Sequence, residues 1–96
     1  MAAIDYPVLT LSGHARDLLH TCTVGTVHSV YKKTINLDFG GQLLALQAAG
    51  SMLSPISLVT ELDELSMERL HIAAGDPVMV QSTALTINKD TSFTWD

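Results

Sequence analysis

Basic residues are scarce in this sequence. Only five of its 96 residues are lysine or arginine, against ten aspartates and glutamates, and the formal net charge is −5. A nucleic-acid partner requires a basic surface that neutralises phosphates, and an anionic membrane attracts clusters of basic side chains. The one basic run is Lys32-Lys33. We therefore expect neither nucleic acid nor a membrane surface among the partners of this protein.

Cysteine is nearly absent, and long apolar runs are missing. Cys22 is the single cysteine, so no disulfide can form within the chain, which fits a reducing compartment. No apolar run approaches the ~20 residues that a membrane-spanning helix needs. Residues 1–20 carry no basic leader with a long apolar core, so no signal peptide is expected. These features predict a soluble, cytoplasmic protein.

Charged residues make up only 16% of the chain, whereas apolar residues make up 47%. This composition predicts a folded chain rather than a disordered one. We interpret residues 1–96 as a single domain, either complete or the N-terminal portion of a longer protein. A small domain normally carries more charge on its surface. We therefore infer that another subunit or further chain covers part of the apolar surface.

The clearest β-pattern is the stretch INLDFGGQLLAL, residues 35–46. Its first apolar residues alternate with polar ones as far as Gly40 and Gly41, which supply the positive φ angles of a tight turn. The leucine-rich residues that follow return as the partner strand. The preceding stretch, residues 23–31, is rich in β-branched residues, but its apolar alternation slips. We expect a bulge at Gly25 to absorb that slip.

Two segments carry helical spacing. Apolar residues recur every three or four positions in residues 13–20, and Ser12 is placed to cap the first turn. Leucines repeat that spacing in residues 62–70, where Ser66 is a candidate cap for a second turn. Gly75 and the proline that follows it predict the end of this segment.

Further strands are expected in residues 55–61, 77–87 and 91–96, with Phe93 and Trp95 on one face of the last strand. Roughly six short strands with one or two short helices predict a mainly β fold, either a small antiparallel β-barrel or a sandwich. We favour the barrel, because closure removes unpaired strand edges. The expected core consists of Ile35, Leu37, Leu44, Leu46, Ile56, Leu58, Val78, Val80, Leu85 and Ile87.

Four histidines raise the question of a metal site. His14 and His20 are separated by about 240° around a helix, so they cannot bind one ion from the same face. His20, Cys22 and His28 would converge only across a turn, and they lack the usual ligand spacing. We therefore expect no metal.

Catalytic motifs are equally sparse. Cys22 has threonine neighbours rather than a basic partner, and no G-x-S-x-G serine motif is present. Gly40 and Gly41 lead into a strand rather than a helix, so they do not form a phosphate-binding loop. We expect no cofactor. Four carboxylates cluster in one segment: Glu61, Asp63, Glu64 and Glu68. The simpler interpretation is that they form the solvated face of a helix, rather than an acid/base pair.

His28 is the most interesting polar residue, because it lies between Val27 and Ser29 on an expected strand. A buried imidazole needs a hydrogen-bond partner for each polar nitrogen. We favour a structural histidine in the core or at an interface, so that replacing it should lower the melting temperature. If the chain holds a ligand site, His28, Ser29 and Asn36 are its candidate members, since their side chains can donate to carboxylate or carbamoyl oxygens.

The order of these elements resembles the beginning of the AllH family. The pattern is a glycine, a valine-histidine-serine strand, an asparagine-leucine pair, a small turn and a leucine-rich return strand, followed by the segments SPISLVTE, GDPVMVQSTALTI and FTW. The resemblance covers roughly residues 18–96. Family members are longer, so the resemblance implies that this chain is their N-terminal portion, a truncation or a stand-alone relative. The residues that carry the match are Gly25, Val27, His28, Ser29, Asn36 and Leu37.

The resemblance implies a cytoplasmic protein of purine and allantoin catabolism. It implies a subunit of an oxamate carbamoyltransferase that works with FdrA-like partners, moving a carbamoyl group between oxalurate and phosphate. Binding a small anionic substrate would normally require arginine side chains, and the chain has only Arg16 and Arg69. We therefore expect an incomplete active site. The second interpretation is a non-catalytic module that docks a partner or self-associates through its apolar surface. The low charge content suggests it, with Phe93 and Trp95 near an end of the chain.

Overall fold

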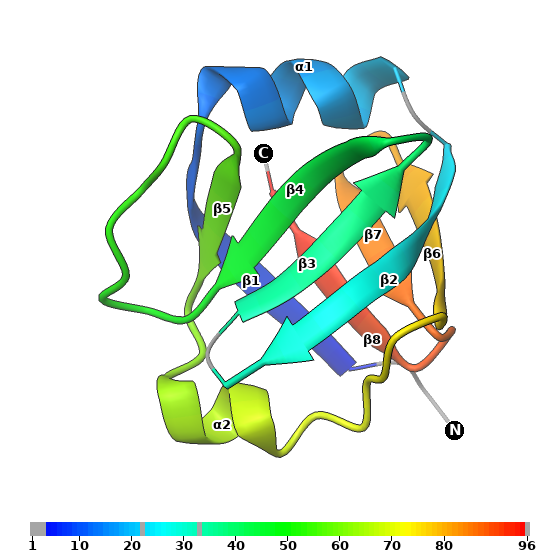
Figure 1. Cartoon of the computed structure of the whole chain (residues 1–96). Coiled ribbons are helices and arrows are strands. Elements are labelled where there is room, and N and C mark those ends of the chain that lie inside the picture. Colours follow the sequence, from blue (N-terminus) through cyan, green and yellow to red (C-terminus); the bar gives the residue numbers. More distant parts are fainter. Residues whose placement is uncertain (1–3, 22, 33, 96) are drawn as a thin grey trace.

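The computed structural model describes residues 4–21, 23–32 and 34–95, which form a closed eight-stranded β-barrel with two short helices (Figure 1). The expected mainly β fold is confirmed, and the barrel is the architecture adopted. The helices are α1 (Gly13–Thr21) and α2 (Glu64–Glu68). The strands are β1 (Ile4–Leu11), β2 (Val24–Tyr31), β3 (Thr34–Phe39), β4 (Gln42–Gln47), β5 (Ser57–Thr60), β6 (Pro77–Gln81), β7 (Ala84–Ile87) and β8 (Thr91–Thr94).

Strand β1 closes the barrel. The strands follow one another around it in the order β1-β5-β4-β3-β2-β6-β7-β8, and β1 pairs with both β5 and β8. The β1–β8 and β4–β5 pairs are parallel and the other pairs are antiparallel. The sequence did not predict β1. Pro7 interrupts its strand-like pattern, and Leu11 fits the helical spacing of the residues that follow. Closure therefore depends on the strand that local patterns did not reveal.

The β3–β4 hairpin forms as expected. Leu37 pairs with Leu44, and both side chains are fully buried in the barrel. Gly40 and Gly41 have φ angles of 67° and 97°, which are readily accessible only to glycine. The Asp38 carboxylate accepts a 2.7 Å hydrogen bond from the Gly41 amide and stabilises the turn.

The irregularity in β2 falls at His28, not at Gly25. Val27 pairs with Leu37 and Ser29 pairs with Asn36, so His28 is an extra residue on β2. Val27 points inward and is 2% exposed, and His28 follows it on the outer face. The bulge then resets the alternation, so that Ser29 also lies on the outer face, opposite Asn36. The expectation of a core histidine is therefore wrong, and the alternative, a histidine at an interface, stays a prediction.

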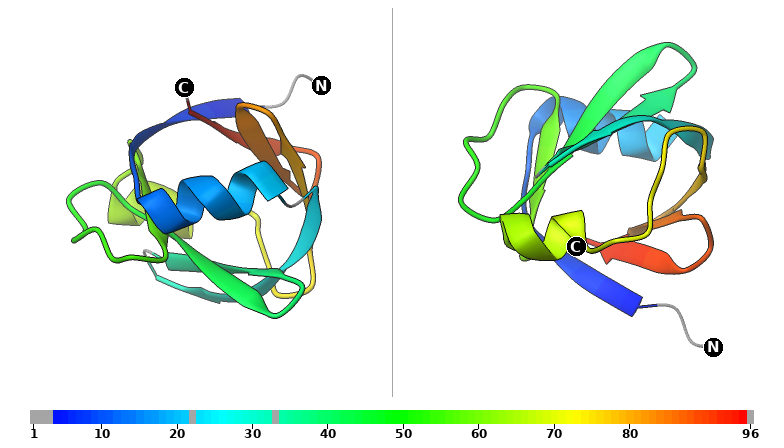
Figure 2. Two further views of the ribbon diagram at one scale, coloured as in Figure 1. Left: turned by 90° about the horizontal axis from the view of Figure 1, so that it is seen from above. Right: turned by 60° about the horizontal axis from the view of Figure 1, so that its bottom comes forward.

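Helix α1 lies across one end of the barrel (Figure 2, left). Its buried residues Ala15, Leu18 and Leu19 join the barrel core. Ser12 caps the helix as expected, because its Oγ accepts a 3.0 Å hydrogen bond from the Ala15 amide. The same hydroxyl donates to the Pro55 carbonyl at 2.9 Å and ties the helix to the loop before β5.

Helix α2 lies at the opposite end of the barrel and is shorter than the expected segment (Figure 1). Its N-cap is Asp63, whose Oδ1 accepts a 2.7 Å hydrogen bond from the Ser66 amide. Ser66 therefore lies in the first turn of α2, where its amide is bonded to the cap residue Asp63. It does not act as the cap of a second turn. Met67 contributes the buried side chain of α2, and Leu65 is 56% exposed.

Nine of the ten expected core residues are buried, and Ile56 is the exception at 44% exposure. Ile56 lies just outside β5, where no strand alternation directs it inward. Phe93 and Trp95 are 0% and 7% exposed, so they pack inside the barrel and cannot form a docking surface. The Phe93 ring packs against Tyr6 with a centroid separation of 5.7 Å.

Candidate functional site

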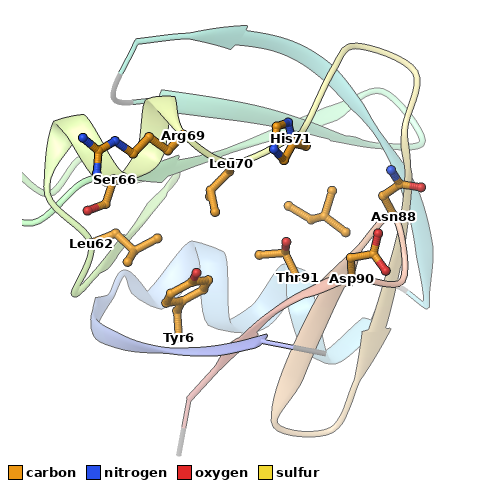
Figure 3. Close-up of a pocket in the computed structure, with 10 residues that line it drawn as sticks. Tyr6, Leu62, Ser66, Arg69, Leu70, His71, Asn88, Asp90 and Thr91 are labelled. Atoms are coloured by element: carbon orange, nitrogen blue, oxygen red, sulfur yellow. The ribbon is translucent and has the colours of Figure 1, made fainter. Parts of the chain in front are cut away.

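A cavity of about 620 Å³ opens beside α2 (Figure 3). It lies between the segment that follows α2, the first half of β1 and the turn between β7 and β8. Its apolar lining consists of Tyr6, Leu62, Leu70 and Ile87. Its polar lining consists of Ser66, Arg69, His71, Asn88, Asp90 and Thr91.

The cap of α2 positions one side of this pocket. Asp63 holds the first turn of the helix, and Arg69 is its C-cap residue. The hydrogen bonds from Ser66 to the Asp63 carboxylate lower its pKa, and the positive charge of Arg69 lowers it further. An ionised Asp63 therefore supports the turn from which Ser66 and Arg69 reach the pocket.

The β7–β8 turn positions the other side. Asn88 and Lys89 have φ angles of 55° and 66°, so both residues at the tip adopt the left-handed conformation of a type I′ turn. Asparagine tolerates this conformation better than lysine does. The turn places Asn88 and Asp90 in the pocket, while Lys89 lines a second, smaller groove between β6 and β2.

The polar groups divide between two ends of the pocket. Arg69 and Ser66 lie at one end, Asn88 and Asp90 at the other, and Leu70 and Tyr6 lie between them (Figure 3). A guanidinium can bind a carboxylate with two hydrogen bonds, and an amide or carboxylate oxygen can accept from an N–H group. This arrangement suits binding of a molecule with both kinds of group. No hydrogen bond joins His71 to a hydroxyl group of the described residues that line this pocket.

The residues expected to form a ligand site meet elsewhere, on the outer surface of β2 and β3. The Asn36 side-chain amide donates a 3.0 Å hydrogen bond to Ser29 Oγ, and Ser29 Oγ lies 3.3 Å from His28 Nδ1. Their convergence is produced by the bulge, because pairing of Ser29 with Asn36 brings the two side chains to the same face. None of the three lines the pocket beside α2.

Sequence reasoning missed the residues that do line this pocket. Arg69 was noticed only as one of two arginines, and Asn88 and Asp90 fall in the short connection between the expected strands 77–87 and 91–96. The pocket assembles from three parts of the chain that are far apart in sequence. The three residues between β7 and β8 include no glycine, although Asn88 and Lys89 have positive φ angles. This lack of glycine was the one local signal that the turn is unusual.

Residues 4–21, 23–32 and 34–95 form no metal site of the kind that the four histidines raised. No group of three or more His, Cys, Asp or Glu side chains in these ranges is arranged to hold a metal ion. Cys22 and Lys33 lie outside the described residues. The helices in the described part of the chain are too short to cross a membrane.

Comparison with known proteins supports one family. Searches of curated proteins and of solved structures gave no significant match. The model of the AllH family N-terminal domain matches residues 6–96, and this match spans the pocket, the bulge and every strand but the first two residues of β1. The chain therefore belongs to the AllH family, whose N-terminal domain it matches.

Proposed function

We propose that this chain is a subunit, or the N-terminal domain of a subunit, of a carbamoyltransferase-type complex. The reaction would be that of an oxamate carbamoyltransferase in purine and allantoin nitrogen catabolism in the cytoplasm. Oxalurate and phosphate would yield oxamate and carbamoyl phosphate. Membership of the AllH family supports this proposal, and the FdrA-like proteins implied by the resemblance are the proposed partners.

The pocket beside α2 is the observation that carries the proposal. Its volume of about 620 Å³ is within the range of small-molecule sites. Oxalurate has a carboxylate at one end and a ureido group at the other. Arg69 can bind the carboxylate, and Asp90 with Asn88 can accept from the N–H groups of the ureido end. The chain then contributes substrate binding, and the partner subunit supplies the rest of the active site.

The experiment is to reconstitute the chain with its FdrA-like partner and to measure carbamoyl phosphate formation from oxalurate. We expect turnover to depend on the chain and to fall at least about tenfold in Arg69→Gln, because one desolvated charge pair is worth more than 1 kcal/mol. The matched control is Arg16→Gln, which removes the other arginine from α1, at the opposite end of the barrel. Unchanged turnover without the chain would refute the proposal.

The second candidate function is a non-catalytic interaction or self-association module. The observation that favours it is a group of exposed apolar side chains outside the barrel: Val24 is 66% exposed, Tyr31 71% and Met79 53%. Light scattering after size-exclusion chromatography measures self-association, and calorimetry with oxalurate separates the two functions. Binding of oxalurate to the isolated chain would favour the enzyme subunit, whereas assembly without any substrate binding would favour the module.

A further inference from the structure

The pocket beside α2 has one polar atom in its apolar middle, and that atom belongs to Tyr6. The half-buried Tyr6 ring extends from β1 into the pocket, and its hydroxyl points toward Leu62 and Leu70 (Figure 3). Among the residues that the structure describes, none forms a hydrogen bond with this hydroxyl. A tyrosine hydroxyl that is partly removed from water usually has a partner. The Tyr6 hydroxyl is therefore available to a ligand.

The neighbours of Tyr6 hold its ring in place. Tyr6 pairs with Phe93 where β1 meets β8, and the centroids of the two rings are 5.7 Å apart. Phe93 is 0% exposed, so the Tyr6 ring rests on a fully buried side chain. On the other side of β1, the Pro7 carbonyl accepts hydrogen bonds from the Thr60 hydroxyl at 2.9 Å and the Glu61 amide at 3.1 Å. A donor held in this way loses little freedom when a ligand binds.

Packing alone does not explain why this residue is a tyrosine. A phenylalanine at the same position would make the same contact with Phe93 and would leave no polar atom beside Leu62 and Leu70. The simplest alternative is a hydroxyl that is solvated in the open pocket and has no role in binding. The two explanations differ in what they expect of a ligand, because only a hydroxyl that binds the ligand responds to an acceptor placed opposite it.

The position of Tyr6 along the pocket indicates which part of a ligand it can reach. Arg69 lies at one end and Asp90 at the other, and Tyr6 lies between them (Figure 3). A molecule that extends from Arg69 to Asp90 therefore passes the Tyr6 hydroxyl with its middle portion. Because a hydroxyl can donate to a carbonyl oxygen, the pocket suits a ligand with a carbonyl group between its carboxylate and its ureido end. Oxalurate has such a group next to its carboxylate.

We propose that Tyr6 is a specificity-determining residue of this pocket. Its hydroxyl donates a hydrogen bond to the carbonyl oxygen next to the carboxylate of the ligand. The pocket therefore selects acylureas, which have this carbonyl group, over ureido acids that have a methylene group in its place. This inference rests on the proposed function, from which the ligand is taken.

Two ligands and three variants test the role of Tyr6 by calorimetry on the chain. The ligands are oxalurate and hydantoate, which have the same two ends but differ in the carbonyl or methylene group between them. Tyr6→Phe removes only the hydroxyl and keeps the ring. Tyr31→Phe is the matched control, because Tyr31 is the other tyrosine, is 71% exposed and does not line the pocket. Thr91→Val removes a neighbouring hydroxyl of the pocket.

We expect the parent chain to bind oxalurate at least about tenfold more tightly than hydantoate, because hydantoate leaves the Tyr6 hydroxyl without an acceptor. Tyr6→Phe should weaken oxalurate binding about three- to tenfold and leave the Kd of hydantoate within about twofold. This comparison of two ligands in two proteins isolates the contact between the hydroxyl and the carbonyl group. Tyr31→Phe and Thr91→Val should each leave the ratio of the two affinities unchanged.

Equal affinity of the parent for the two ligands would overturn the inference. A preference that survives in Tyr6→Phe, or that disappears in Thr91→Val, would also overturn it. Thermal melts check that each variant is folded, and the ratio measured for the parent keeps the inference testable if Tyr6→Phe melts early.

Carbamoyl phosphate formation, measured with the FdrA-like subunit, separates this inference from the proposed reaction. Selective binding of oxalurate that is lost in Tyr6→Phe, without any carbamoyl phosphate formation, would refute the reaction and leave the inference standing. Carbamoyl phosphate formation by a mixture in which the chain itself binds neither ligand would support the reaction and overturn the inference.

Discussion

Gly25 and Phe39 are in such close contact that no side chain fits at Gly25. A Cβ atom added to Gly25 would lie 2.5 Å from Cδ1 of Phe39 and 2.6 Å from the carbonyl oxygen of Asp38. Gly25 is on β2 and Phe39 ends β3, and Phe39 is only 4% exposed. The glycine therefore lets an aromatic ring fill the barrel beneath β2. It marks a close approach and not a bulge.

Gly25→Ala should accordingly destabilise the protein by about 1–3 kcal/mol, because overpacking forces a shift of the ring and of the β3 backbone. Chemical denaturation measures the change. Gly13→Ala is the control, since no atom lies within 4 Å of the added Cβ and alanine favours the helix that begins there. Phe39→Leu should restore only part of the loss in Gly25→Ala, because the Asp38 carbonyl remains in place. Equal stability of Gly25→Ala and the parent would show that β2 and β3 separate easily.

Leu37→Ala should cost about 2–5 kcal/mol, the range for truncating a fully buried leucine. Leu37 is 0% exposed and packs between its cross-strand partners Val27 and Leu44. Leu43→Ala on the same hairpin is the comparison, because Leu43 is 40% exposed. Urea denaturation of both variants checks this prediction, and a similar loss in the two would contradict the assigned register.

His28→Ala should change the free energy of unfolding by less than about 0.5 kcal/mol, as expected for an exposed side chain. Asn36→Ala should cost about 0.5–1.5 kcal/mol, because it removes the half-buried hydrogen bond to Ser29. Thermal melts of the two variants measure the difference. A drop of several degrees in His28→Ala would instead support the buried histidine that the sequence suggested.

The Asp63 cap should make part of the stability depend on pH. The pKa of Asp63 is lowered in the folded protein by its hydrogen bonds with Ser66. Stabilisation by the ionised carboxylate is therefore complete above the pKa of an unfolded aspartate, about 4, and is lost as pH falls through the lower folded value. Asp63→Asn keeps a side-chain acceptor but removes the charge. Its deficit against the parent should be present at pH 7 and disappear in acid, as measured by urea denaturation at each pH. A constant deficit would show that the charge is irrelevant.

The positions of the exposed apolar side chains bear on how the low charge content should be understood. The sequence suggested that apolar surface is covered by a partner or further chain, and it placed Phe93 and Trp95 near an end of the chain. Both are inside the barrel, whereas exposed apolar side chains lie on several elements, among them Leu9 on β1, Val24 on β2 and Met79 on β6. A pattern of residue types reports that apolar surface exists. It does not report which face of a strand points outward, because a shift of one residue in the pairing register exchanges the two faces.

Local chemistry was enough to determine the β3–β4 hairpin, the Ser12 cap of α1 and most of the core, because alternation, glycine turns and caps act over a few residues. The same chemistry carried the family resemblance. Tertiary structure alone decided closure through β1, the position of the bulge at His28 and the pocket of Arg69 and Asp90. Each of these depends on pairing between residues far apart in the chain, where packing around the closed barrel, and not local preference, selects the register.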